Sequence, residues 1–144
     1  DKCRHLYDVE LYALVSALPS SYTSRFGEIV WAAYGRQEAW PAIIYDPCLT
    51  VGGARQLARK NLGKRHLIYF FERNQAPFTV LRDNRLTNWE DGFIKEYHLL
   101  GKMAKSGGKS FERALTLAQQ EHGLPIENRM DWNHQEVGPP PRVF

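Results

Sequence analysis

Basic side chains gather in two stretches of the chain that contain no acidic residue. The first stretch runs from Pro47 to Phe71 and contains Arg55, Arg59, Lys60, Lys64 and Arg65. The second runs from Gly101 to Phe111 and contains Lys102, Lys105 and Lys109. Because the whole chain has a net charge of only +3, it is the clustering that favours binding of a polyanion such as DNA. The alternative is that both stretches form ordinary solvated surfaces of helices and loops.

The histidines and cysteines do not form a pattern that is typical of catalysis or metal binding. No nucleophile elbow, phosphate-binding glycine pattern or metal-ligand spacing accompanies the scattered histidines, which are His5, His66, His98, His122 and His134. Cys3 and His5 could supply half of a metal site, but a second pair of ligands is missing. We therefore expect neither an enzyme nor a bound metal or other cofactor. With Cys48 as the remaining cysteine, a reducing compartment is favoured over a disulfide framework.

The length and composition favour a single soluble domain. The chain has 144 residues, of which 43% are hydrophobic and 24% are charged, as in ordinary globular proteins. No apolar run approaches the roughly 20 residues that span a bilayer, so we expect no membrane contact. The chain begins with Asp rather than Met, and we expect it to be part of a longer protein.

The first half of the chain predicts a short helix followed by strands. Apolar residues at helical spacing predict a helix over residues 8–18, capped by Asp8, ended by Pro19 and followed by a polar linker through residue 24. Residues rich in β-formers predict strands over 26–33, 40–45, 66–71 and 78–81. The long connection over 47–64 contains ARQLARKNL, which we expect to form one or two helical turns.

The last third predicts helices. Thr87-Asn88-Trp89-Glu90 reads as a capping box for a helix that ends at Gly101, and Ser110 can cap a second helix that ends near Gly123. From residue 124 the chain is polar and ends in GPPPRVF, which predicts an extended or disordered tail over 124–144. These elements predict an α+β domain: a small five-stranded antiparallel β-barrel over about 25–87, a C-terminal helical bundle over about 88–123, and a short N-terminal helix with its linker over 1–24.

The string FGEIVWAAYGRQEAWPAII resembles the signature of the PWWP domain family. In that family an aliphatic-Trp-Ala strand and a Gly-containing arch lead to an aromatic-Pro pair, which here is Trp40-Pro41, with Ala39 at a position that is usually Trp. Tyr45-Asp46-Pro47 and the later LIYFFE resemble the bromodomain-and-PHD-finger scaffold branch. The resemblance covers about residues 25–123. The rival interpretation is another barrel of the Royal superfamily, such as a Tudor or chromo-like module.

The resemblance implies an aromatic cage for a methylated lysine. By position, the second and third rings of the cage fall on Trp40 and Phe70. The first falls on Gln37, which is not aromatic, so that the cage has two walls, uses Tyr34 instead, or is degenerate. Strand alternation places Phe70 and Phe71 on opposite faces, so that one can serve the cage while the other fills the core; the alternative is that both are core residues. Glu72 either attracts the methylammonium or is an ordinary turn residue.

These observations lead to three hypotheses about function. The first, implied by the resemblance, is a nuclear chromatin reader that binds histone H3 trimethylated at lysine 36 together with nucleosomal DNA. The second is a DNA-binding or nucleosome-binding module with a degenerate cage, for which Gln37 is the argument. The third is a protein-interaction module that uses the helical face or the Pro-rich tail, and other chromatin proteins are a further class of partner for this domain.

Overall fold

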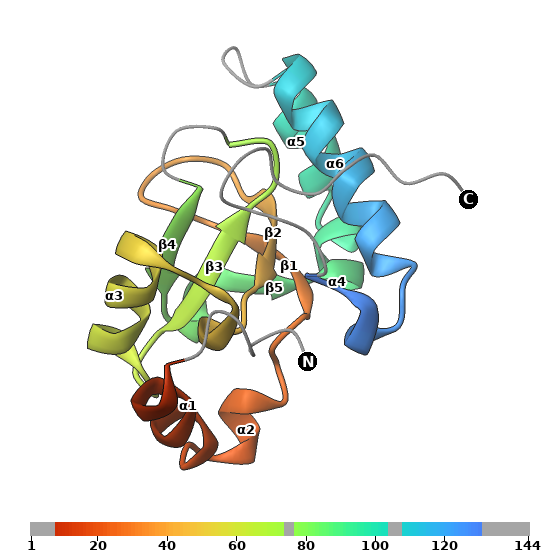
Figure 1. Ribbon diagram of the computed structural model, residues 1–144. Coiled ribbons are helices and arrows are strands. Elements are labelled where there is room, and N and C mark those ends of the chain that lie inside the picture. Colours follow the sequence, from red (N-terminus) through yellow and green to blue (C-terminus); the bar gives the residue numbers. More distant parts are fainter. Residues whose placement is uncertain (1–7, 74–76, 104–107, 131–144) are drawn as a thin grey trace.

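Five short antiparallel strands form the centre of the computed structural model, which describes residues 8–73, 77–103 and 108–130 (Figure 1). The strands are β1 (Ile29–Ala32), β2 (Trp40–Ile44), β3 (His66–Phe70), β4 (Phe78–Leu81) and β5 (Leu86–Asn88). Their order across the sheet is β4-β3-β2-β1-β5. The four strands that we located from the sequence are confirmed, the first three with shorter extents than predicted, and β5 was not located.

The predicted barrel is wrong in one respect, because the sheet does not close. Within the described residues, the edge strands β4 and β5 each pair with one neighbour, β3 and β1 respectively. The sheet is nevertheless curled, since Leu81 of β4 and Leu86 of β5 reach the same apolar cluster as Val30 and Ile68. Strands that are apolar on both faces predict that both faces are covered. They do not determine whether the two edges are hydrogen-bonded to each other.

Alternate residues of the strands face two different apolar clusters, as the pleat of a strand requires. Phe70 belongs to the cluster inside the curled sheet, together with Ala42 and Ile44. Phe71 belongs to the cluster on the other face, which also contains Phe111 of helix α6 (Gly108–His122). Phe70 and Phe71 therefore lie on opposite sides of the sheet, as predicted.

The N-terminal segment packs beside the long connection between β2 and β3. Helix α1 (Val9–Ser16) begins as predicted, with the Asp8 carboxylate accepting a hydrogen bond from the backbone N–H of Leu11 at 2.9 Å. The predicted polar linker instead contains a short helix, α2 (Ser20–Thr23). The connection itself forms the 3-10 helix η2 (Pro47–Leu49) and the ten-residue helix α3 (Gly52–Asn61).

Within the described residues, three α-helices follow β5, rather than the two we predicted. Helix α4 (Trp89–Ile94) is capped by Asn88, whose side chain accepts from the backbone N–H of Asp91 at 2.8 Å, so the predicted cap at Thr87 is wrong by one residue. The chain turns at Glu96, with a φ of 63°, before helix α5 (Tyr97–Met103). Gly101 does not end this helix region as predicted. It lies within α5, where any side chain would overlap the ring of Phe111 in α6.

Helices α5 and α6 lie together on one side of the sheet, and α3 lies beside the β3–β4 side (Figure 1). Helix α6 packs on β2 and β1, while α5 packs on α6. The core at this junction is aromatic: the rings of Trp31 and Trp89 are stacked with centroids 4.7 Å apart, and the indole N–H of Trp31 donates to the Trp89 carbonyl at 3.0 Å.

The residues just after α6 belong to the folded domain rather than to a tail. Residues 126–128 form the 3-10 helix η4 (Ile126–Asn128), and Met130 joins the core cluster under α6. The buried guanidinium of Arg129 donates to the carbonyls of Gly27, His122 and Leu124 at 2.8–3.0 Å. The predicted extended tail therefore starts too early at residue 124, and its part from 131 to 144 lies outside the described residues.

Candidate functional site

The ends of β2 and β3 bring two aromatic residues of the expected cage to neighbouring positions. Ala42 pairs with Phe70 in the sheet register, so Trp40, two residues before Ala42 on the same face, lies diagonally opposite Phe70. Trp40 is half-buried and packs against both apolar clusters. Its indole N–H donates to the Phe71 carbonyl at 2.7 Å, and its ring meets that of Phe111 edge-on, with centroids 5.4 Å apart. This hydrogen bond fixes the end of β3 beside the start of β2.

A cation already lies on the rings at this corner. The guanidinium carbon of Arg73 is 4.6 Å from the centroid of the Phe70 ring and 5.6 Å from that of Tyr34. Arg73 also donates a hydrogen bond to the side-chain carbonyl of Gln37 at 2.7 Å. Tyr34 and Gln37 both belong to the arch, which we define as residues 33–39 between β1 and β2. Three of the residues expected in the cage therefore surround one positive charge.

Phe70 and Tyr34 differ strongly in their exposure. Phe70 is 1% exposed, whereas Tyr34 is 48% exposed. The burial of Phe70 alone would fit the alternative of a core residue, but its ring also carries the Arg73 guanidinium. Sequence reasoning missed Arg73, because a basic residue in a polar turn between two strands carries no signal of its own.

Glu72 forms a turn whose side chain is already engaged. Its φ is 60°, a left-handed conformation that is costly for a residue with a side chain, by roughly 1–2 kcal/mol. Its carboxylate accepts a hydrogen bond from the Arg113 guanidinium of α6 at 2.7 Å. Glu72 thus behaves as a turn residue that is tied to α6, and it directs Arg73 back towards the sheet.

The basic residues predicted to contact DNA are distributed over separate surfaces. Arg59 pairs with Asp8, at 2.8 Å, and with Glu10. Arg55 is half-buried near the charge of Asp8, while Lys60 and Lys64 are exposed. On the other side of the sheet Lys109 is exposed at the start of α6. Lys105 and the side chain of Lys102 lie outside the described residues.

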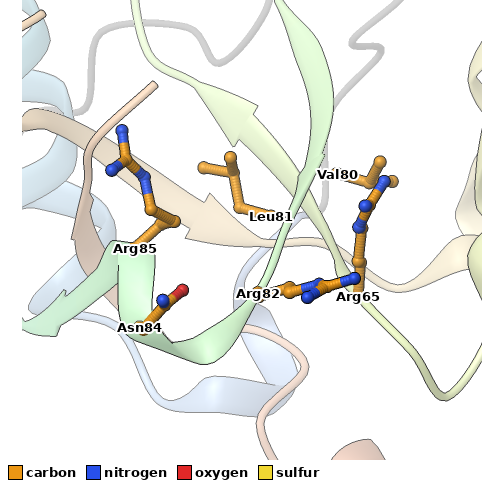
Figure 2. A pocket seen from close by; sticks show the side chains of 6 residues that line it. All are labelled: Arg65, Val80, Leu81, Arg82, Asn84 and Arg85. Carbon is orange, nitrogen blue, oxygen red and sulfur yellow. The ribbon is translucent and has the colours of Figure 1, made fainter. Parts of the chain in front are cut away.

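Arg65 lies at a different basic surface, a hollow of about 230 Å³ near the β4 edge (Figure 2). We call this the basic hollow, and it is lined by Arg65, Val80, Leu81, Arg82, Asn84 and Arg85. Arg82 is exposed, and its side chain extends towards Arg65 (Figure 2). The guanidinium groups of Arg65 and Arg82 over a partly apolar floor are suited to an anion such as a phosphate, which accepts paired N–H donors. The guanidinium of Arg85 adds positive charge but already donates to the carbonyls of Ala33 and Gly35.

Asp83 lies between Arg82 and Arg85 in the sequence, but its carboxylate contacts residues outside the basic hollow. The Asp83 carboxylate lies 2.6 Å from a guanidinium nitrogen of Arg25 and 2.7 Å from Nε2 of His66. It does not line the basic hollow. Sequence reasoning missed Arg82 and Arg85 because it searched for stretches without acid, and Asp83 interrupts this one.

The described residues offer no assembled metal site. No group of three or more His, Cys, Asp or Glu side chains that could hold a metal ion is found among them, and Cys3 and His5 lie outside them. None of the described helices is both long enough and apolar enough to cross a membrane.

The chain belongs to the PWWP domain family, whose model matches residues 27–123. A solved structure of similar fold is the solution structure of the second PWWP domain of the WHSC1L1 protein, with a TM-score of 0.50 and 24% sequence identity, covering 67% of this chain and 81% of that chain. No match to this chain is found among curated proteins. PWWP domains generally act as chromatin readers that bind methylated lysine and DNA, and they are non-enzymatic modules typically found on chromatin in the nucleus.

Proposed function

We propose that this domain reads a methylated lysine of a histone tail while it contacts the DNA of the same nucleosome. The candidate cage consists of Trp40, Phe70, Tyr34 and Gln37, with Glu72 at its border. By resemblance, the mark is histone H3 trimethylated at lysine 36. The DNA contact is made by the basic hollow, and exposed Lys60 of α3 and Lys64 after it are further candidate DNA contacts on a separate surface.

The observation that carries this proposal is the position of the Arg73 guanidinium over Phe70 and Tyr34. A trimethylated lysine is a cation without an N–H donor, so it is held by the electron-rich faces of rings rather than by a carboxylate hydrogen bond. A corner of the fold whose rings hold one cation has the electrostatics that a methylated lysine needs in the place of that cation. Trp40, diagonal to Phe70 on the same face, supplies a further ring.

The aromatic rings alone would bind a histone tail only weakly, so a DNA contact is needed as well. Each ring contributes roughly 0.5–2 kcal/mol to holding a cation, so two or three rings give only a few kcal/mol. After the entropy of association is subtracted, we expect affinity for an isolated tail peptide near the millimolar range. A DNA contact on the same nucleosome raises the effective concentration of the tail and multiplies the two weak affinities.

The test compares binding to nucleosomes with and without the trimethyl mark. Tyr34→Ala and Trp40→Ala should each reduce the preference for methylated nucleosomes and leave DNA affinity largely intact. Because Tyr34 is half exposed, its variant should fold even if Trp40→Ala does not. Tyr12→Ala, at a half-exposed tyrosine of α1, is the matched control and should change neither affinity. An equal loss on both kinds of nucleosome in Tyr34→Ala and Trp40→Ala would argue against the cage.

A second candidate function is a DNA-binding or nucleosome-binding module without methyl-lysine recognition. The observation that favours it is Gln37, an amide at the position where the family has an aromatic ring. NMR titration with trimethylated and unmethylated tail peptides separates the two candidates. Shifts at Trp40 and Phe70 that depend on the methyl groups would exclude the second candidate, and their absence would favour it.

A further inference from the structure

We propose that Arg73 is an internal occupant of the candidate cage, and that a methylated lysine binds there only after this guanidinium leaves. The inference rests on the proposed function and adds a residue that sets its affinity. Arg73 contacts the rings of Phe70 and Tyr34 and the amide of Gln37, which are three of the residues proposed to hold the ligand. The Arg73 guanidinium and a methylated lysine would therefore contact the same side chains.

The ring of Phe70 has no free face for a second cation. Its side chain is 1% exposed, and the guanidinium lies over the ring at 4.6 Å, inside the range of a cation–π contact. Its remaining surface packs into the apolar cluster inside the sheet. An incoming methylammonium therefore competes with Arg73 rather than adding to it.

The two residues that precede Arg73 are held in place by neighbouring elements. Trp40 fixes the carbonyl of Phe71, and Arg113 of α6 fixes the carboxylate of Glu72. Glu72 itself adopts a left-handed conformation, with a φ of 60°, and this turn directs Arg73 back towards the Phe70 ring. Among the described residues no carboxylate pairs with Arg73, so the rings and one amide are what hold its charge.

Gln37 favours this occupant over a trimethylated lysine. Its side-chain carbonyl accepts an N–H from Arg73 at 2.7 Å, whereas a trimethylammonium group has no N–H to donate. An aromatic ring at this position would attract both cations through its face. The side chains of Gln37 and Arg73 thus hold each other in place. This contact gives a physical role to Gln37, the position at which the sequence departs from the family pattern.

Competition by Arg73 should lower the apparent affinity for a methylated lysine by a measurable factor. When only a fraction of molecules has an open cage, the apparent affinity falls by that fraction. If Arg73 fills the cage in about four molecules of five, its removal should tighten binding roughly fivefold.

The experiment measures binding of two probes by NMR titration: the tetramethylammonium ion and an H3 tail peptide carrying trimethyllysine. The proteins are the wild-type chain, Arg73→Ala and Arg36→Ala. Arg36 is an exposed arginine of the same arch, so its variant controls for the loss of one positive charge near a basic peptide. We expect Arg73→Ala to bind both probes about fivefold more tightly than wild type, and Arg36→Ala to bind tetramethylammonium as wild type does.

Each other outcome overturns the inference in a distinguishable way. Equal binding by wild type and Arg73→Ala would leave the reader function standing and remove the internal occupant. Weaker binding by Arg73→Ala would mean that Arg73 is part of the ligand site. Absence of binding by all three proteins would reject the inference together with the proposed cage. In the wild-type protein, displacement should also shift the Arg73 Nε–H resonance as tetramethylammonium is added, and a resonance that does not move while the probe binds would contradict displacement.

Discussion

The Nε–H of Arg85 donates a hydrogen bond to the carbonyl of Ala33 at 2.9 Å. A second hydrogen bond from the same guanidinium reaches the carbonyl of Gly35. Arg85 also lines the basic hollow. One side chain therefore connects the proposed DNA contact to the arch that carries Tyr34 and Gln37, so that the two proposed binding surfaces share a structural element.

Alanine substitutions at two arginines of the basic hollow should have different effects on binding. Arg82→Ala should weaken binding to duplex DNA and reduce the slope of log K against log salt by about 0.9 in magnitude, because one phosphate contact is lost. Arg85→Ala should do the same and also weaken binding of the trimethylated peptide, because the arch loses its anchor. Salt-dependent DNA titration and peptide titration measure the two effects. A DNA affinity and slope unchanged in both variants would show that DNA binds elsewhere.

Substitutions at position 37 of the arch test how a non-aromatic residue at the first ring position of the candidate cage affects binding. Gln37→Phe should strengthen binding of the trimethylated peptide by roughly 0.5–1 kcal/mol, since a ring face replaces an amide and the hydrogen bond to Arg73 is lost. Gln37→Ala separates these two effects, because it loses the hydrogen bond without gaining a ring. Peptide titration measures both. Weaker binding in Gln37→Phe than in Gln37→Ala would contradict a cage at this corner.

Gly92 should be essential for the packing that supports the cage strands. It is buried in α4, and any side chain there would overlap the indole ring of Trp31 in β1. We expect Gly92→Ala to lower the free energy of unfolding by about 1–3 kcal/mol or more, measured by denaturant unfolding. Gly53→Ala in α3 is the matched control, because no atom lies within 4 Å of the added carbon. Equal stability of Gly92→Ala and Gly53→Ala would contradict the helix–sheet packing described here.

The stability of the fold should fall in alkaline solution. Burial, together with the nearby charge of Glu72, raises the pKa of Tyr69 from 10.0 to about 12. A raised pKa in the folded state means that stability is complete below pH 10 and is lost as the pH rises towards 12, by at most about 1.4 kcal/mol per pH unit for one tyrosine. Tyr69→Phe should reduce the steepness of this dependence in denaturant unfolding between pH 9 and about 11.5, and part of it should remain because burial also raises the pKa of Tyr45 and of Tyr22. An unchanged slope would contradict the buried position of the Tyr69 hydroxyl.

Local patterns in the sequence predicted four of the five described strands because their β-forming residues lie in short runs between clear turns. The same kind of evidence failed where tertiary packing decided the outcome. Gly101 reads as a helix end, yet it lies inside α5 because Phe111 of another helix needs the space of its missing side chain. The sheet edges could not be predicted either, since closure depends on the pairing of β4 with β5 and not on the apolarity of any strand.

The candidate site was only partly visible in the sequence for a related reason. Trp40 and Phe70 were proposed from their positions in the family resemblance, Trp40 because it stands beside Pro41 in the motif, and alternation only separated Phe70 from Phe71. Arg73 could not be found, because its role depends on the left-handed turn at Glu72 and on Gln37 from another strand connection. Arg82 and Arg85 were not recognised from the sequence because Asp83 lies between them, and the contacts of its carboxylate with Arg25 and His66 are distant in the sequence.

The most direct test of the reader function is an NMR measurement of proton–proton contacts in the complex with the trimethylated H3 peptide. The trimethylammonium protons should show nuclear Overhauser effects to ring protons of Trp40, Phe70 and Tyr34. A bound peptide whose methyl protons contact none of these rings would contradict the proposed cage, even if the domain still bound DNA.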